Sequence, residues 1–267
     1  MSRTTDLDTI AKPAAPAAHV TQATAVEQAR AVAEVQAAVT VAQAMPRDIA
    51  RAVAEMRDSC GRTAVAARAF YSVPNRGNGP TVHLARELAR IWGNIDYSVR
   101  ELRRDDEAGV SEVLATAWDQ QTNVRSSRSF QAPHAKMARG QRQALVDLDD
   151  IYRNNQNVGA KAVRECIMSV LPRWFTEEAQ DTCRRTLDQG EGVPLADRIA
   201  TMVKAYGDRG ITVPRIEAKT GKRRGQWDAG DVAQLGIDYT SITRDGVDAD
   251  ALFPVAPVTA DELGGAS

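Results

Sequence analysis

Between residues 77 and 130, the spacing of hydrophobic positions is first that of a helix and then that of strands. Apolar residues from Val82 to Trp92 recur on one face at helical spacing, which predicts an amphipathic helix. Pro80 suits the first turn, because a proline lacks the N–H group that would have no partner there. Gly93 directly after Trp92 ends the helix.

The residues after this helix alternate between apolar and polar with a period of two, as strands do. The alternation predicts three strands joined by polar turns, over 95–99, 110–118 and 122–130. A fourth strand is predicted earlier, over 63–73, where the side chains also alternate. We therefore expect an α+β fold, in which a three- to four-stranded antiparallel β-meander packs on helices and a small helical module lies at the C-terminal end.

Helical spacing is also present on both sides of this segment. An Ala- and Val-rich, weakly amphipathic helix is predicted over about 20–44, and a second helix over 46–60. After the strands, one helix is predicted to run to about Asn157, and another to follow it until Pro172. Thr176 is expected to precede the first turn of the next helix.

Changes in composition predict how the chain is divided. The first residues are rich in Ala, Pro and Thr, which is typical of disorder. Gly190 and Gly192 indicate a flexible linker, across which the C-terminal module would move independently. The expected division is a disordered N-terminus (1–20), a core with an N-terminal helical arm (21–188), a linker (189–193), a small helical module (194–253) and a flexible tail (254–267).

Composition also bounds the class of protein. A length of 267 residues with 43% hydrophobic content fits a soluble protein with a sizeable core. No apolar run is long enough to cross a bilayer, and the N-terminal residues do not have the pattern of a signal peptide. The three cysteines are scattered and form no C-x-x-C pair, so we expect buried free thiols in a reducing cytoplasm.

Charge is segregated along the sequence, although the whole chain carries only −1. From Gln226 to the end, eight acidic residues accompany a single Arg244, which gives this end about −7 and the remainder about +6. The segment 120–146 contains no Asp or Glu at all. Its basic residues are interspersed with Ser, Gln and Asn, a composition that neutralises phosphates without reading bases. A solvated loop is the alternative interpretation.

Specific residues are candidates for these contacts. The candidates for phosphate binding are Arg125, Arg128, Lys136, Arg139, Arg142 and, more weakly, Arg164. Thr81, with the helix start behind it, is a candidate for one more phosphate. Tyr97 and Phe130 are candidates for base stacking, with core packing as the alternative for each. A basic loop suited to an acidic partner tail contains Lys219, Lys222, Arg223 and Arg224.

The sequence supports a catalytic site less strongly than it supports a binding site. Asp147 and Asp150 share one face of a predicted helix, and a metal-dependent nuclease could use such a pair, but exposed helix acids are the better interpretation. The three histidines have no metal-ligand spacing. The segment 77–81 lacks the G-K-[ST] ending of a nucleotide-binding loop. We therefore expect that the protein is not an enzyme and has no catalytic residue, no bound metal and no cofactor.

Several short runs of residues also resemble those of a known protein family. The runs 79–87, 92–95 and 100–102 resemble a pattern of phage single-strand annealing proteins of the RecT/Redβ superfamily. The likeness continues at 117–119, 122–123, Asp147, 150–152, 157–160, 164–167 and 171–172, and in the C-terminal part at 202–203, 210–212, Tyr239 and 245–246. It covers about residues 45–253 and is an ordered pattern rather than one diagnostic motif.

This resemblance implies a function. Proteins of this family bind single-stranded DNA and anneal complementary strands without ATP, assembling into rings or helical filaments during phage homologous recombination in the host bacterial cytoplasm. It implies as partners the annealed duplex, a phage exonuclease, and a host single-strand-binding protein engaged through the C-terminal module. The chain departs from the family in being nearly neutral rather than basic. The alternatives are a passive single-strand-binding protein, a metal-dependent nuclease and a structural phage protein.

Overall fold

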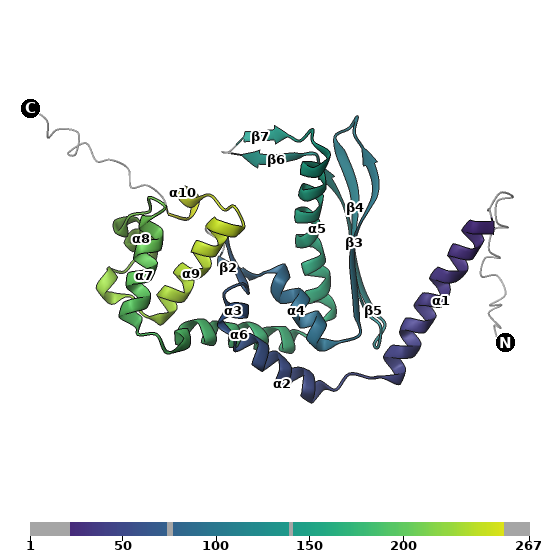
Figure 1. Ribbon diagram of the computed structural model, residues 1–267, viewed down its shortest axis with the longest axis horizontal. Coiled ribbons are helices and arrows are strands. Elements are labelled where there is room, and N and C mark those ends of the chain that lie inside the picture. Colours follow the sequence, from purple (N-terminus) through teal and green to yellow (C-terminus); the bar gives the residue numbers. More distant parts are fainter. Residues whose placement is uncertain (1–21, 74–76, 139–140, 254–267) are drawn as a thin grey trace, which may run out of the picture. The chain divides into compact units, whose positions relative to one another are not determined.

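The computed structural model describes residues 22–73, 77–138 and 141–253 (Figure 1). The chain divides into two compact units, residues 1–46 and 47–267. The fold is α+β and contains the predicted antiparallel meander and C-terminal helices. The predictions made for 1–20 and 254–267 lie outside the described residues. Among the described helices, none combines the length and the apolar character that crossing a bilayer requires.

Helix α1 (Gln22–Ala44) is the described part of the first unit and confirms the predicted Ala- and Val-rich helix. Most of its valines are exposed, among them Val26, Val32 and Val35, and Val39 is half-buried. Its charged residues include one exposed i,i+4 ion pair, between Arg30 and Glu34. The helix therefore owes its conformation mainly to alanine's high helix propensity.

The centre of the second unit is a three-stranded antiparallel sheet in the order β3 (Ile95–Asp105), β4 (Val110–Asp119), β5 (Val124–Pro133). The prediction of a meander is confirmed, but β3 is longer than the predicted strand 95–99. The polar residues up to Asp105 stay paired with β4 beyond a register shift between Glu101 and Arg103. Cross-strand hydrogen bonding therefore extends into a stretch whose composition predicts a turn.

Helix α5 (Leu148–Val170) lies along one face of this sheet (Figure 1). That face carries the buried Val113, Ala115 and Ala117 of β4. A Cβ atom added at Gly159 would lie 2.5 Å from Cγ1 of Val99, so a glycine is required for the helix to approach this closely. The prediction of two helices separated near Asn157 is wrong, because the glycine there marks close packing within one continuous helix.

The strand predicted over 63–73 is also corrected. Thr63–Ala66 forms the short helix α3, and Phe70–Val73 forms β1, which pairs with β2 (Gly77–Pro80) in a separate two-stranded sheet. Alanine-rich alternation is compatible with a helical turn, so the period-two pattern was ambiguous there. The predicted amphipathic helix is confirmed as α4 (Val82–Trp92).

Helices α2 (Ile49–Cys60), α4, α5 and α6 (Arg173–Gln189) share one hydrophobic cluster with the sheet. Its fully buried side chains include Met56, Leu88, Ile167 and Phe175. Cys60, Cys166 and Cys183 are buried free thiols, as predicted. Helix α6 begins directly after Pro172, so Thr176 lies inside it and the predicted helix start was four residues late.

A second cluster is formed by the C-terminal helices α7 (Leu195–Gly207), α8 (Val213–Thr220), α9 (Ala229–Arg244) and α10 (Ala249–Leu252). Tyr206 is fully buried, and its hydroxyl donates a hydrogen bond to the carbonyl of Leu235 at 2.7 Å. Phe253 packs against the Tyr206 ring. The predicted small helical module is therefore present, with a core of its own.

This module is docked on the core. Ile237 of α9 belongs to the hydrophobic cluster of the core. The buried Ser241 hydroxyl accepts a hydrogen bond from the backbone N–H of Ser72 in β1 at 2.8 Å. The side chains of Asn78 and Gln234 are also hydrogen-bonded across the junction. These contacts do not agree with independent movement of the module, because burying Ile237 and pairing Ser72 both require the docked position.

Candidate nucleic-acid interface

The basic segment forms an edge of the molecule's main sheet and the hairpin that follows it. Strand β5 pairs with β4 alone, so its outer side has no strand neighbour within its sheet. After Pro133 the chain forms β6 (Ala135–Ala138) and β7 (Gln141–Ala144), a two-stranded hairpin beside the first turns of α5 (Figure 1). The residues predicted from their composition thus lie on an edge strand and a hairpin, rather than in a loop.

Two of the predicted phosphate ligands lie on opposite faces of β5. Arg125 pairs with Trp118 and Arg128 with Ala115, three positions apart, and successive side chains in a strand point to opposite faces. Arg128 therefore lies on the face that α5 covers, at its edge, while Arg125 lies on the other face. Both side chains are exposed. Together they present cationic groups on both sides of one edge strand.

Arg125 is held in place by an aromatic ring. Its guanidinium lies over the Trp118 indole, 4.1 Å from the ring centroid, in a cation–π contact. The indole N–H donates a hydrogen bond to Oδ1 of Asn123 at 3.1 Å, which fixes the ring at the turn between β4 and β5. Trp118 is 9% exposed. Its role is thus to support Arg125.

The hairpin adds exposed cations beyond the sheet. Lys136 faces Gln143 and Arg142 faces Met137 in the β6–β7 register, which places the two basic residues on opposite faces of the hairpin. Met137 is 68% exposed, although it is apolar. Arg139, the fifth basic residue predicted for this segment, lies outside the described residues. The hairpin therefore projects positive charge in two directions from the edge of the sheet.

About half of the described basic residues outside this segment have an acidic partner, whereas those described within it have none. Among the described residues, neither Arg125, Arg128, Lys136 nor Arg142 forms an ion pair. Elsewhere in the chain, many basic residues are paired, among them Arg47, Arg57, Arg62, Arg90, Arg103, Arg104, Arg164, Arg173, Arg184, Arg215 and Lys222. Exposed cations without an acidic neighbour are available to an external anion.

Three of the predicted nucleic-acid ligands have structural roles. Arg164 is paired with Glu165 at 2.7 Å and stacks over Tyr71, with only 15% of its side chain exposed. Tyr97 and Phe130 are partly buried and pack against the core cluster. Their strand positions point them toward α5, because each lies opposite a buried β4 residue. Arg164 is therefore a poor phosphate ligand, and packing describes these two rings better than base stacking does.

Thr81 is the N-cap of α4. Its hydroxyl oxygen accepts a hydrogen bond from the N–H of Leu84 at 3.3 Å and donates to the carbonyl of Arg68 at 2.5 Å. The hydroxyl is thus occupied, and the residue's part in any phosphate site is to shape the helix start.

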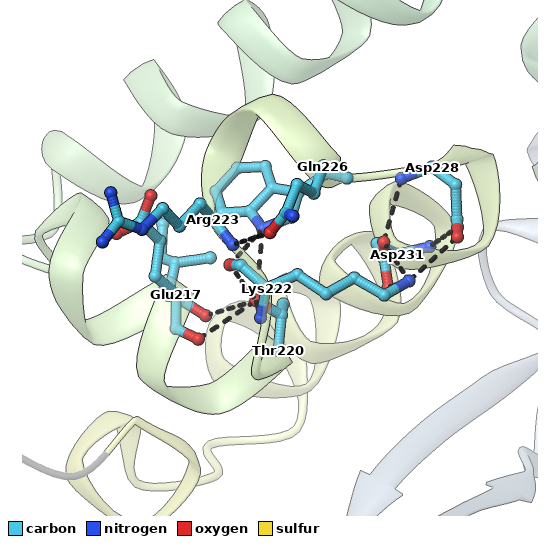
Figure 2. Close-up of polar contacts among 9 residues, drawn as sticks. Glu217, Thr220, Lys222, Arg223, Gln226, Asp228 and Asp231 are labelled. Carbon is cyan, nitrogen blue, oxygen red and sulfur yellow. Dashed lines mark hydrogen bonds and ion pairs between the residues drawn. The ribbon is translucent and has the colours of Figure 1, made fainter.

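Two of the four basic residues predicted to bind a partner are paired with the module's own acids, and the pairing of Lys222 is drawn in Figure 2. The Lys222 ammonium lies 2.9 Å from Asp228 and 2.8 Å from Asp231, and these hydrogen bonds raise its pKa. Lys219 lies 3.4 Å from the buried Asp238. Of the four predicted partner-binding residues, Arg223 and Arg224 keep exposed side chains without an ion pair among the described residues.

Two basic residues of α5 were missed from the sequence. Arg153 and Lys161 are exposed and have no ion pair among the described residues, and they lie eight positions apart on one helix face with Asn157 between them. Their periodicity was visible, but the predicted helix break near Asn157 separated them. Arg100 on β3 is a third exposed basic residue without an ion pair in the described part of the chain.

A serine, a histidine and an acid also lie close together at the far end of the sheet. Nε2 of His134 is 2.9 Å from Oγ of Ser111, and Nδ1 is 3.8 Å from Asp106. However, Ser111 is fully buried and its hydroxyl donates to Glu101 at 2.8 Å, so it cannot meet a substrate as a nucleophile. The buried Ser111 and His134 thus tie the residue before β6 to the sheet, while Asp106 lies at the surface.

Within the described ranges, no group of three or more His, Cys, Asp or Glu side chains is arranged to hold a metal ion. Asp147 caps α5 through the N–H groups of Asp149 and Asp150, so this acid cluster has a structural use. In the comparisons with known proteins, no family model, curated protein or solved structure matches this chain.

Proposed function

We propose that this protein binds single-stranded DNA along the edge strand β5 and the β6–β7 hairpin. The observation that carries the proposal is the acid-free segment whose described basic side chains are exposed and form no ion pair. Phosphates neutralised by such side chains release their counterions, which supplies affinity without sequence recognition. The cations of β5 lie on both faces of an edge, which favours a backbone path along that edge over one across a flat face.

We further propose that the protein anneals complementary strands without ATP. Annealing requires an extended strand with neutralised phosphates and accessible base edges, so that complementarity alone selects the product. The proposed site consists of arginine and lysine side chains, whereas Tyr97 and Phe130 pack against the core. These two rings therefore do not stack on the bases, and the base edges stay accessible to a complementary strand. The resemblance to the RecT/Redβ superfamily supports this function, and with it rings or filaments, a partner exonuclease, a host single-strand-binding protein and a bacterial cytoplasm.

A passive single-strand-binding protein is the second candidate, because the same cations would coat a strand without joining it to another. A metal-dependent nuclease has less support, because Asp147 is used as a helix cap.

The binding step is tested by titrating a fluorescent single-stranded oligonucleotide with protein at several salt concentrations. We expect log K to fall linearly with log salt, with a slope of about −0.7 for each phosphate contacted, hence about −3 for four described cations. Fluorescence anisotropy measures this directly, with potassium glutamate and potassium chloride compared to separate anion effects. A slope near zero would show that phosphate neutralisation is not the main contribution.

A further inference from the structure

A cavity lies where the C-terminal module meets the core. It has a volume of about 540 Å³ and is lined by small apolar residues of the α3 region together with Arg68, His83, Leu84, Glu87, Thr240 and Arg244. Arg68 and His83 belong to the core, whereas Thr240 and Arg244 belong to α9 of the module. The lining is therefore contributed by both parts, and it includes no residue of the acid-free segment.

The charged groups of this cavity favour an anion. Arg68 and Arg244 are exposed and have no ion pair among the described residues. Glu87 is occupied elsewhere, since it accepts hydrogen bonds from Arg90 at 2.9 Å and from Ser59 at 2.7 Å. The hydrogen bond with Arg90 is the main reason that the pKa of Glu87 is held below its ordinary value. Arg90 is shared with Glu55, so it neutralises Glu87 only in part, but both Glu87 oxygens are engaged by Arg90 and Ser59 and neither forms an ion pair with Arg68 or Arg244.

Asp245 adds a negative charge beside Arg244, which acts against the binding of an anion. It follows Arg244 in the chain, and burial raises its pKa while the nearby His83 and Arg244 act in the other direction. Neither Arg68 nor Arg244 forms an ion pair with Asp245 or Glu87 among the described residues, so both guanidinium groups can still bind an anion.

The start of α4 adds a further positive contribution. The N–H groups of Val82 and His83 in its first turn form no hydrogen bond with the described residues, as is usual for a helix N-terminus. Such groups and the helix dipole attract anions, phosphate in particular. Thr81 connects the helix start to the cavity, because its hydroxyl donates to the Arg68 carbonyl. Arg68 is therefore held beside the first turn of α4.

We propose that this cavity binds a phosphate group, with Arg68 and Arg244 as ligands beside the start of α4. Guanidinium groups bind phosphate through paired charge-assisted hydrogen bonds, and the cavity lining contains two of them. Because the two arginines come from the core and the module, a bound phosphate stabilises the docked arrangement. The site is separate from the β5–β7 segment, so it does not depend on strand annealing.

The test uses the full chain and inorganic phosphate. We expect phosphate to raise the melting temperature in a concentration-dependent way, whereas chloride at matched ionic strength does not. Arg68→Ala and Arg244→Ala should each weaken phosphate binding by at least about tenfold, because each removes a charge-assisted hydrogen bond. Arg51→Ala is the matched control: this arginine is also exposed and without an ion pair among the described residues, but it does not line the cavity. Equal phosphate affinity in all four proteins would overturn the proposal.

Two further titrations identify the molecule that supplies the phosphate and distinguish the cavity site from the proposed DNA-binding segment. A mononucleotide and a single-stranded oligonucleotide are titrated into wild type, Arg244→Ala and a variant with Arg125, Arg128 and Arg142 changed to Glu. The last variant should keep its affinity for inorganic phosphate, even though it loses the oligonucleotide. Weakened mononucleotide binding by Arg244→Ala identifies a nucleotide ligand, and weakened oligonucleotide binding alone identifies a strand phosphate. Loss of phosphate binding in the triple variant but not in Arg244→Ala would contradict a site in this cavity.

Discussion

Replacing Arg125, Arg128 and Arg142 together by Glu is expected to reduce the affinity for single-stranded DNA by at least about a hundredfold. The three side chains are exposed and form no ion pair with the described residues, so their loss removes phosphate contacts without breaking an ion pair, although Arg125 also loses its cation–π contact with Trp118. The salt dependence should become shallower by about 2 in the log–log slope, since each lost contact accounts for about 0.7. Fluorescence anisotropy at three salt concentrations measures both quantities.

The matched control reverses three arginines that have acidic partners instead. Arg62, Arg173 and Arg184 form exposed short-range ion pairs with Asp58, Glu177 and Asp181. Changing them to Glu alters the net charge by the same amount, and loss of exposed pairs costs little stability. If both triple variants lost affinity equally, binding would depend on total charge rather than on the β5–β7 segment, and the proposed path would be wrong.

Replacing Asp119 by Ala is expected to lower the free energy of unfolding by about 3–5 kcal/mol. Asp119 and Arg47 form a bidentate ion pair with distances of 2.7 and 2.5 Å, and their side chains are only 3% and 7% exposed. Without Asp119 the Arg47 charge stays buried and uncompensated, and the N–H groups of Gln121 and Thr122 lose their acceptor. Urea unfolding monitored by circular dichroism measures the loss.

Two comparisons separate the buried charge from general effects. Glu177→Ala breaks an exposed pair with Arg173 and should leave the urea midpoint nearly unchanged. Adding Arg47→Met to Asp119→Ala should recover part of the loss, because no charge is then left buried. A loss below about 1 kcal/mol in Asp119→Ala would show that the pair does not stabilise the junction of α2 and the sheet.

The same ion pair predicts a sensitivity to acid. Burial by itself raises the pKa of Asp119, but hydrogen bonds from Arg47 and Thr122 outweigh it and hold the pKa below its ordinary value. The contribution of a depressed carboxyl is present above its unfolded pKa of about 3.9 and is lost as the pH falls through the folded value. Wild type should therefore lose more stability below about pH 4 than the Asp119→Ala variant does.

The elements predicted best from the sequence were those with one strong period. Helix α4 and strands β4 and β5 have apolar residues at regular spacing, and the turn between β3 and β4 has a glycine at positive φ, Gly109. The predictions were wrong where the local composition indicated a turn or a helix break but contacts with a neighbouring element held the chain in a strand or a helix. The polar end of β3 is held by its neighbour β4, and Gly159 allows close approach to Val99 rather than ending a helix.

The candidate interface was predicted only in part, for a related reason. The acid-free composition of 120–146 identified Arg125, Arg128, Lys136 and Arg142, because a local count of charges requires no knowledge of the fold. Which cations remain free depends on contacts between distant residues. Lys222 is neutralised by Asp228 and Asp231, and the sequence alone does not show that pairing.

The cavity at the module junction could not be predicted at all. Its two arginines, Arg68 and Arg244, are far apart in the sequence and meet only because α9 docks beside α3 and α4. The sequence indicated one component, the start of α4 behind Thr81, as a phosphate site. The other components required the docked position of the module, which the glycine-containing linker had argued against.

The central claim is that the cations of β5 and the hairpin bring complementary strands together. The most direct measurement is the rate at which two complementary oligonucleotides, each labelled with one member of a fluorescence energy-transfer pair, anneal in the absence of ATP and divalent metal. We expect wild type to anneal the strands well above the spontaneous rate. With the variant in which Arg125, Arg128 and Arg142 are changed to Glu, annealing should proceed only at the spontaneous rate. Binding of both strands by wild type with annealing at or below the spontaneous rate would contradict the central claim and identify a passive coat.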